Sequence, residues 1–343
     1  MGSDQVALTR LEPARRIAED AKAADLRGDP DQALSLFDQA IRELKRMPQS
    51  SLLADVLRWK GTTHRERGET QQALELYERS LGVAVAVKSP VAQAHALNCI
   101  GIIAQRRGDL TTADDCYAAA RSAAIDAEDM QLVGMIAQNC GVIANIRGDL
   151  DAARVAYAEA LSAFEAMGNH EGACWVLNNL GMLHTSRREF DDADAAFDRG
   201  LANARQRGDR RMEGLLELNR ARLRIEQQRF DDAAVCCSLA LALANARGDR
   251  LQAAEALRCS ASLSRARGAH DEAETTLSRA KELADLAEDA LLSAEIMRDL
   301  GELCLQRGKH ADARTAWQSA ADGFAALGAL LEAKDVSGRL GLL

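Results

Sequence analysis

A repeat with a period of 40 residues constrains this chain more than any other feature of its sequence. The segment LRGDPDQAL around Gly28 recurs, with substitutions, at seven further positions without an insertion: Gly68, Gly108, Gly148, Arg188, Gln228, Gly268 and Gly308. An alanine stands five residues after each of these eight anchors, from Ala33 to Ala313. A chain of 343 residues with such a period is expected to fold into stacked copies of one small unit rather than into separate globular domains.

Glycine also marks the midpoint of many repeats. Ten of the sixteen positions spaced 20 residues apart are glycine, where the overall content of 24 glycines would place about one. Glycine commonly ends a helix in the left-handed conformation, and the Asp or Asn that often follows it caps the next helix. We therefore predict one helix in every 20 residues and one helix pair in every 40. The six exceptions to glycine are Pro48, Lys88, Glu128, Arg188, Gln228 and Glu288.

Two further positions of the repeat alternate in size. A small residue stands seven positions before each anchor: Ala21, Gly61, Gly101, Gly141, Gly181, Ala221, Ala261 and Gly301. The residue nine positions after each anchor is bulky in most repeats: Phe37, Tyr77, Tyr117, Tyr157, Phe197, Cys237, Leu277 and Trp317. This pattern predicts an antiparallel helix pair in which the bulky side chain fills the gap that the small residue leaves. Cys237 and Leu277 are the departures.

The pattern Leu97–Gly101–Ala113–Tyr117–Ala120 has the spacing of the tetratricopeptide repeat (TPR). The chain resembles the long TPR type, with a 40-residue unit, of kinesin light chains, LGN-like polarity adaptors and bacterial regulator sensor regions. The resemblance implies an all-α, right-handed superhelical α-solenoid of antiparallel helix pairs whose first helices line a concave groove. We expect an N-terminal tail at 1–9, eight TPR units at 10–328 and a capping helix at 329–343.

Asparagines recur in the first helices, two residues before the small position: Asn139, Asn179 and Asn219. The resemblance implies that asparagines in this register bind the backbone of an extended peptide. An amide suits that role because it donates and accepts hydrogen bonds at once. We predict such a row in the groove. The alternative is that these asparagines tie the first helices to one another or face solvent.

Apolar side chains must contribute to binding, because each hydrogen bond from an asparagine side chain contributes a net free energy of only about 0.5–1.5 kcal/mol. Trp175, Met135 and Met182 are predicted to project into the groove, and Asn178 and Gln138 to add polar anchors. Trp175 is the most informative of these, since aromatic residues dominate binding hot spots. Its alternative role is packing between repeats.

Arginines occupy predicted inward positions of the first helices in the C-terminal half: Arg222, Arg258, Arg265 and Arg298. A guanidinium binds a carboxylate with two parallel hydrogen bonds, so these residues could clamp an acidic side chain or a C-terminal carboxylate. The alternative is a groove wall of salt bridges with the glutamates interspersed among them.

Composition narrows the expected partners and the expected compartment. The formal net charge of −9 disfavours non-specific binding to nucleic acid or to anionic membranes. The stretch 233–246 carries no charged residue, but its 14 residues are fewer than the roughly 20 that span a bilayer. The first residues lack the features of a secretory signal, and the eight cysteines form no CxxC pair. A cytoplasmic protein is expected.

The sequence has no phosphate-binding GxxxxGK loop, no HExxH and no GxSxG motif, and we predict neither enzymatic activity nor a cofactor nor a metal site. The predicted function is a non-enzymatic scaffold or adaptor that holds an extended protein or peptide partner in the concave groove. The alternative is a ligand- or peptide-sensing regulatory module that acts on a separate effector chain. The end repeats also offer a route to self-association.

Overall fold

The computed structural model describes residues 3–45 and 50–341, which form seventeen helices and no strand. Two compact units divide the chain, unit 1 at 1–143 and unit 2 at 144–343. Unit 1 contains α1 (Ser3–Leu26), α2 (Pro30–Leu44), α3 (Ser51–Glu66), α4 (Thr70–Ala86), α5 (Pro90–Arg106), α6 (Leu110–Asp126) and most of α7 (Met130–Ile146). Residues 3–9, which the sequence assigned to a tail, are the first turns of α1.

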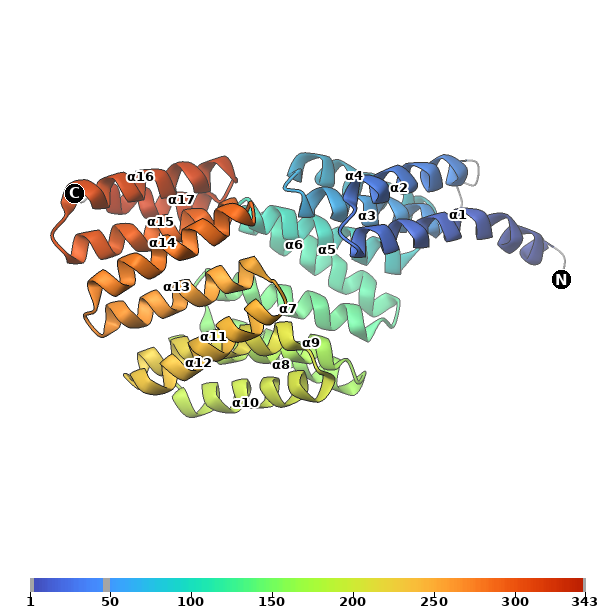
Figure 1. The fold of residues 1–343 in the computed structure, drawn as a ribbon. Coiled ribbons are helices and arrows are strands. Elements are labelled where there is room, and N and C mark those ends of the chain that lie inside the picture. Colours follow the sequence, from blue (N-terminus) through green and yellow to red (C-terminus); the bar gives the residue numbers. More distant parts are fainter. Residues whose placement is uncertain (1–2, 46–49, 342–343) are drawn as a thin grey trace. The chain divides into compact units, whose positions relative to one another are not determined.

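Unit 2 contains the following helices, which can be traced in Figure 1 from green through yellow and orange to red: α8 (Leu150–Ala166), α9 (His170–Ser186), α10 (Phe190–Arg207), α11 (Arg210–Glu226), α12 (Phe230–Ala246), α13 (Arg250–Ala266), α14 (His270–Leu286), α15 (Ala290–Gln306), α16 (His310–Ala326) and α17 (Leu330–Leu340). The last helix, α17, packs on α16, where Val336 is buried with Trp317 and Phe324.

The predicted helix ends are confirmed at every described position. All ten glycines spaced by the half-repeat have φ between 63° and 79°. The non-glycine residues at the same spacing adopt the left-handed region as well, with φ between 54° and 60°: Lys88, Glu128, Arg188, Gln228 and Glu288. Pro48 lies outside the described residues. Capping follows the prediction too, since the Asp29, Asp109 and Asp149 side chains accept the backbone N–H three residues on.

The size pattern is confirmed as a contact between the two helices of a pair. A Cβ placed on Gly61, Gly101 or Gly181 would lie only 2.5–2.7 Å from a ring carbon of Tyr77, Tyr117 or Phe197. Trp317 covers Gly301 in the same way. Of the three repeats that carry alanine at the small position, two have the smaller Cys237 and Leu277 opposite it, and the first combines Ala21 with Phe37.

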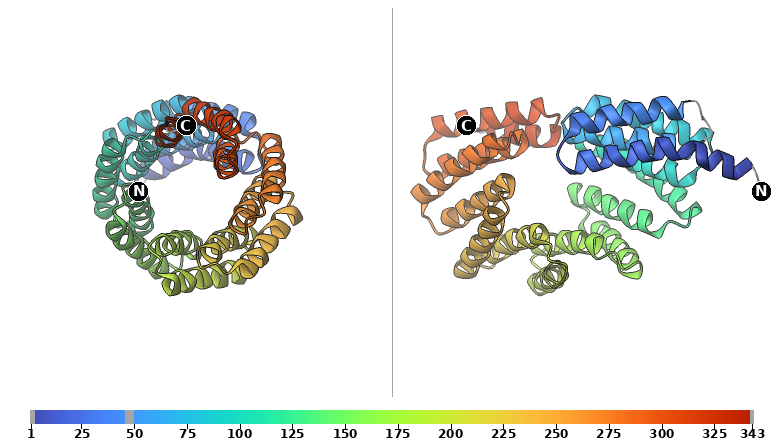
Figure 2. Two further views of the ribbon diagram at one scale, coloured as in Figure 1. Left: turned by 90° about the vertical axis from the view of Figure 1, so that its left-hand side faces the viewer. Right: turned by 45° about the vertical axis from the view of Figure 1, so that its right-hand side comes forward.

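The helices form two layers within each unit. In unit 2 the first helices of successive pairs, α9, α11, α13 and α15, contact one another directly, and in unit 1 α3 contacts α1 and α5. No comparable contact joins successive second helices among the described residues. The first helices therefore lie on the inner side of the curve of each unit, as the arrangement of α9 to α16 in Figure 2 shows. The fold is an all-α solenoid of antiparallel helix pairs.

None of the helices in the described part of the chain has the length and apolar character that crossing a membrane requires.

Candidate functional site

The inner surface of unit 2, formed by α9, α11, α13 and α15, is called here the first-helix face. Its side chains point away from the second helices, and three of them are prominent. Trp175 is 37% exposed and Met182 is 44% exposed, both on α9. Arg222 on α11 is also exposed. Large exposed apolar side chains next to an exposed arginine are typical of an interaction surface rather than of a core.

A first depression, the Trp175 hollow, has a volume of about 340 Å³ and lies where α9, α11 and α13 begin. Ten residues line it: Glu171, Trp175, Asp209, Arg211, Met212, Leu215, Asp249, Leu251, Gln252 and Glu255. Four carboxylates and one guanidinium are among them. The hollow therefore combines apolar walls with an excess of negative charge.

Glu255 differs from the other acidic residues of this hollow. Asp209 and Asp249 cap α11 and α13, where their carboxylates accept the Met212 and Gln252 backbone N–H groups. Glu255 makes no ion pair or hydrogen bond within the described residues, and burial raises the pKa of its carboxyl group. The positive charges of Arg222 and Arg258 offset this effect only in part.

Two adjoining depressions, the Arg222 hollows, lie nearer the C-terminal ends of the first helices and share Arg222 and Glu226. One, of about 390 Å³, is also lined by Met182, Thr185, Ser186, Arg188 and Asn219. The other, of about 470 Å³, is also lined by Ile225, Ser262, Arg265, Ala266 and Gln306. Positive charge exceeds negative charge here, the reverse of the Trp175 hollow.

Three of the four predicted asparagines, Asn139, Asn178 and Asn219, form hydrogen bonds between successive first helices. Asn219 Nδ2 donates to Asn178 Oδ1 at 2.7 Å, and both side chains are buried, with 3% and 4% exposure. In unit 1, Asn139 Nδ2 donates to Asn98 Oδ1 at 2.8 Å. Each pair joins residues 41 positions apart. The alternative interpretation, that asparagines tie first helices together, therefore describes these two pairs. Asn179 is half-buried in α9.

Three of the predicted arginines are paired with acidic residues in the wall of the face. Arg258 Nε lies 2.5 Å from Asp299 Oδ2, again 41 positions away, and Arg258 also pairs with Glu295. Arg265 Nη1 lies 2.6 Å from Glu302 Oε2. Arg298 Nε is 3.5 Å from Asp299. These ion pairs match the alternative of a salt-bridged wall.

Arg222 is different from these three. Its Nη1 donates to Asn219 Oδ1 at 2.8 Å, and it forms no ion pair in the described part of the chain. The guanidinium is thus oriented by a neutral amide and keeps most of its donors. A guanidinium has five N–H groups, so donors remain for a carboxylate.

Three predicted site residues lie on α7, in unit 1. Met135 is exposed, and Gln138 and Asn139 are half-buried.

The sequence predicted Trp175 as a binding residue, but it did not predict the hollow that Trp175 lines. The available signal was its register, six residues before the small position. Continued by steps of 40, this register gives Leu215, Glu255 and Glu295, and the first two line the hollow.

A cluster of His184, Glu189 and Asp192 brings three ligand-type atoms within 4.8 Å of one another. Glu189 already accepts bonds at 2.7 Å from Arg187 Nε and lies 2.7 Å from His184 Nδ1. A guanidinium bound to the same carboxylate opposes a metal cation. His64, Glu69 and Arg67 repeat this arrangement. Both sets stand where glutamate replaces the capping aspartate, so the arrangement serves to close the turn.

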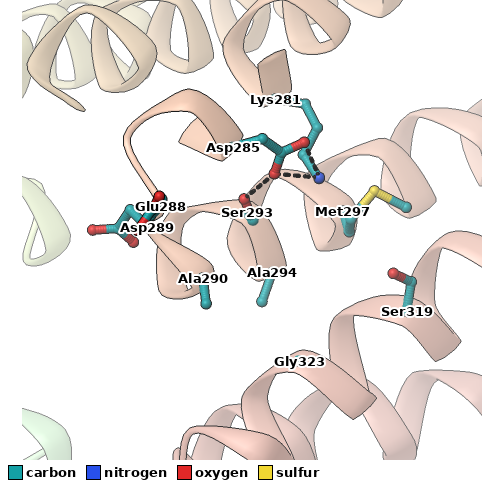
Figure 3. Close-up of a pocket in the computed structure, with 10 residues that line it drawn as sticks. All are labelled: Lys281, Asp285, Glu288, Asp289, Ala290, Ser293, Ala294, Met297, Ser319 and Gly323. Carbon is teal, nitrogen blue, oxygen red and sulfur yellow. Dashed lines mark hydrogen bonds and ion pairs between the residues drawn. The ribbon is translucent and has the colours of Figure 1, made fainter. Parts of the chain in front are cut away.

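Another hollow, of about 370 Å³, lies between α14, α15 and α16 (Figure 3). Its polar groups bond to one another, since Asp285 accepts from Lys281 Nζ at 2.7 Å and from Ser293 Oγ at 2.8 Å. Little hydrogen-bonding capacity is left for a ligand in this network.

Comparison with known proteins identifies the family. The MalT-like TPR region matches residues 123–326, which is more than half of the chain. The chain belongs to the MalT-like TPR family. No match was found among the curated proteins.

Solved TPR structures share the fold of this MalT-like chain at low sequence identity. A Rap protein complexed with Competence and Sporulation Factor has 15% identity and a TM-score of 0.61, over 96% of this chain and 97% of the Rap chain. The Rap conjugation gene regulator of plasmid pLS20, in complex with the Phr* peptide, has 15% identity and a TM-score of 0.61, over 84% and 80% of the two chains.

Another solved structure that shares the fold is the Signal Transduction ATPase with Numerous Domains protein from Pyrococcus horikoshii, which has a tetratricopeptide repeat sensor. It has 12% identity and a TM-score of 0.64, over 98% of this chain and 50% of that one.

Proposed function

We propose that this MalT-like TPR chain is a non-enzymatic scaffold that holds an extended protein or peptide segment against the first-helix face of unit 2. The observation that carries the proposal is the presence of Trp175, Met182 and Arg222 on one face, each beside a hollow. The similarity to Rap proteins bound to a peptide or factor supports a ligand of this kind.

The apolar side chains give the affinity in this proposal. Trp175 and Met182 lie on the same helix and are both partly exposed, so a partner can bury them without disturbing the core. Rigid aromatic anchors at the centre of an interface commonly contribute about 2 kcal/mol or more. Trp175 is therefore the principal anchor.

The polar side chains give orientation. Asn219, whose side chain is buried, donates to Asn178 and accepts from Arg222, so it holds the Arg222 guanidinium in position. Asn179 is the other amide of the predicted row in unit 2. Arg258, Arg265 and Arg298 hold the wall through their ion pairs, and Arg222 is the proposed contact for a carboxylate. The roles of Met135, Gln138 and Asn139 on α7 stay sequence-based predictions.

Selection from a random dodecapeptide library displayed on phage, with the whole chain as bait, tests the proposal. Enriched peptides are synthesised and titrated by calorimetry against the wild type and Trp175→Ala. The control is Val235→Ala, which removes an apolar side chain that is 67% exposed on the second helix α12.

We expect binding to weaken about 30-fold in Trp175→Ala and to stay unchanged in Val235→Ala. Equal binding by the two variants, or a library that yields no specific peptide, contradicts the proposal. Small-angle scattering with the bound peptide then separates a rigid scaffold from a sensing module, because only the sensor changes its dimensions.

A further inference from the structure

We propose that the bound segment is bipolar: a basic side chain enters the Trp175 hollow, and an acidic side chain three to five residues away binds Arg222. This inference rests on the proposed function and adds the chemistry and the direction of the partner. It follows from the opposite charge of two depressions that lie along the same helix, α11.

The Trp175 hollow fits a guanidinium or ammonium group. Its apolar wall contains the partly exposed indole of Trp175, and a cation over an indole face is attracted by the ring quadrupole. Glu255 stands in the same wall without an ion pair among the described residues, whereas Asp209 and Asp249 are bonded as caps. The fourth carboxylate, Glu171, lies 3.8 Å from Arg207. Glu255 is thus the carboxylate available to a guest cation. Burial disfavours the charged form of the Glu255 carboxyl group and raises its pKa. A guest cation beside it would stabilise that charged form.

The Arg222 hollows fit a carboxylate. Arg222 is exposed, and Asn219 fixes one of its nitrogens at 2.8 Å. Arg188 lines the same depression and adds positive charge, while Glu226 is the acidic residue there. Arg265, in the adjoining depression, is held by Glu302 at 2.6 Å. Arg222 is therefore the guanidinium available for two parallel hydrogen bonds with a carboxylate.

The separation of the two hollows sets the spacing of the two charges. Met212 and Leu215 line the first hollow and Arg222 the others, seven to ten residues apart on α11, which corresponds to about 10–15 Å at 1.5 Å per residue. An extended segment covers about 3.3 Å per residue, so about three to five residues bridge that distance. A segment laid in the opposite direction would place like charges together, and the face therefore selects one direction.

The test uses the peptide that binds best in the display selection described above. Three synthetic versions are compared with it: the basic residue changed to Gln, the acidic residue changed to Gln, and the two residues exchanged. Each is titrated against the wild type, Glu255→Gln and Arg222→Gln. Matched controls are Glu272→Gln and Arg279→Gln, which change exposed residues on α14, a second helix.

We expect neutralising the basic residue to weaken binding about tenfold on the wild type and to have little effect on Glu255→Gln. The acidic residue should couple to Arg222 in the same way, and the exchanged peptide should bind about 100-fold more weakly. The control variants should bind all versions like the wild type.

Two results separate failure of this inference from failure of the proposed function. Peptides that depend on Trp175 but show no preference for a basic and an acidic residue overturn the inference and leave the scaffold proposal standing. Equal losses on the wild type and on Glu255→Gln also overturn it. Absence of any peptide that depends on Trp175 overturns both.

Discussion

Replacing Gly101 with alanine is expected to destabilise the protein, although alanine is the better helix former. Gly101 lies in the middle of α5, and a Cβ there would lie 2.5 Å from Cε1 and 2.8 Å from Cδ1 of Tyr117 on α6. Tyr117 is fully buried, and its hydroxyl donates to Gln105 Oε1 at 3.0 Å. The ring therefore cannot move aside without straining its packing and this hydrogen bond.

The magnitude follows from two opposing terms. Alanine gains about 1 kcal/mol over glycine in a helix interior. Overpacking a core by one methyl group costs typically about 1–3 kcal/mol, and loss of the Tyr117 hydrogen bond adds about 1 kcal/mol. The free energy of unfolding should therefore fall by about 1–3 kcal/mol.

The matched control is Gly82→Ala. Gly82 lies inside α4, and a Cβ there would meet nothing within 4 Å. This variant should be more stable by up to about 1 kcal/mol, because only the helix-propensity term acts. Adding Tyr117→Leu to Gly101→Ala should recover part of the loss, since the chain itself combines Ala261 with Leu277.

The assay is urea unfolding of the whole chain followed by circular dichroism, with hydrogen exchange of α5 and α6 as a local readout. A local readout is needed because repeat arrays often unfold in parts. If Gly101→Ala raised stability as Gly82→Ala does, the argument that the glycine register exists for close helix packing would be refuted.

Three further predictions concern the inter-repeat bonds, the turns and the ion pairs. A double-mutant cycle on Asn178→Ala and Asn219→Ala should give a coupling energy of about 0.5–1.5 kcal/mol in urea unfolding, because the two amides bond to each other; additive losses would contradict the bond. Gln228→Gly should raise the unfolding free energy by about 1 kcal/mol, because Gln228 has φ +60°, whereas Gln228→Ala should not. Glu302→Gln should cost about 1 kcal/mol at pH 7, measured by urea unfolding across pH. Although burial acts to raise the Glu302 pKa, the bond from Arg265 and nearby positive charge hold that pKa below its ordinary value of about 4.5, so the cost should disappear as the pH falls through the lowered pKa; a cost that persists in acid would contradict this.

The turns and the packing register could be predicted from the sequence because both depend on residues within one repeat. A glycine or its replacement every 20 residues sets the helix ends, and the pairing of small with bulky residues sets the contact inside each pair. These requirements recur in every unit. Repetition therefore reveals even the weaker positions, such as Arg188 and Gln228, which adopt the same left-handed conformation.

The partners of the polar groups on the first helices could not be predicted in the same way. The bond between Asn219 and Asn178 depends on the stagger between neighbouring first helices, which brings residues 41 positions apart together. A single repeat contains no information on that stagger. From the sequence alone, the amides could bond either to one another or to a bound peptide.

The division into two compact units was not foreseen either. The boundary falls inside α7, after Ile143, where the 40-residue period continues without a change. Nothing in the spacing marks it, because the signals that set the period are local to each helix pair.

Photo-cross-linking tests most directly the claim that the first-helix face of unit 2 receives the partner. A selected peptide carrying a benzophenone side chain is irradiated with the whole chain, and mass spectrometry identifies the modified residues. We predict adducts on α9, α11 and α13, at residues around Trp175 and Arg222. Adducts confined to the second helices α10, α12 and α14 would contradict the account.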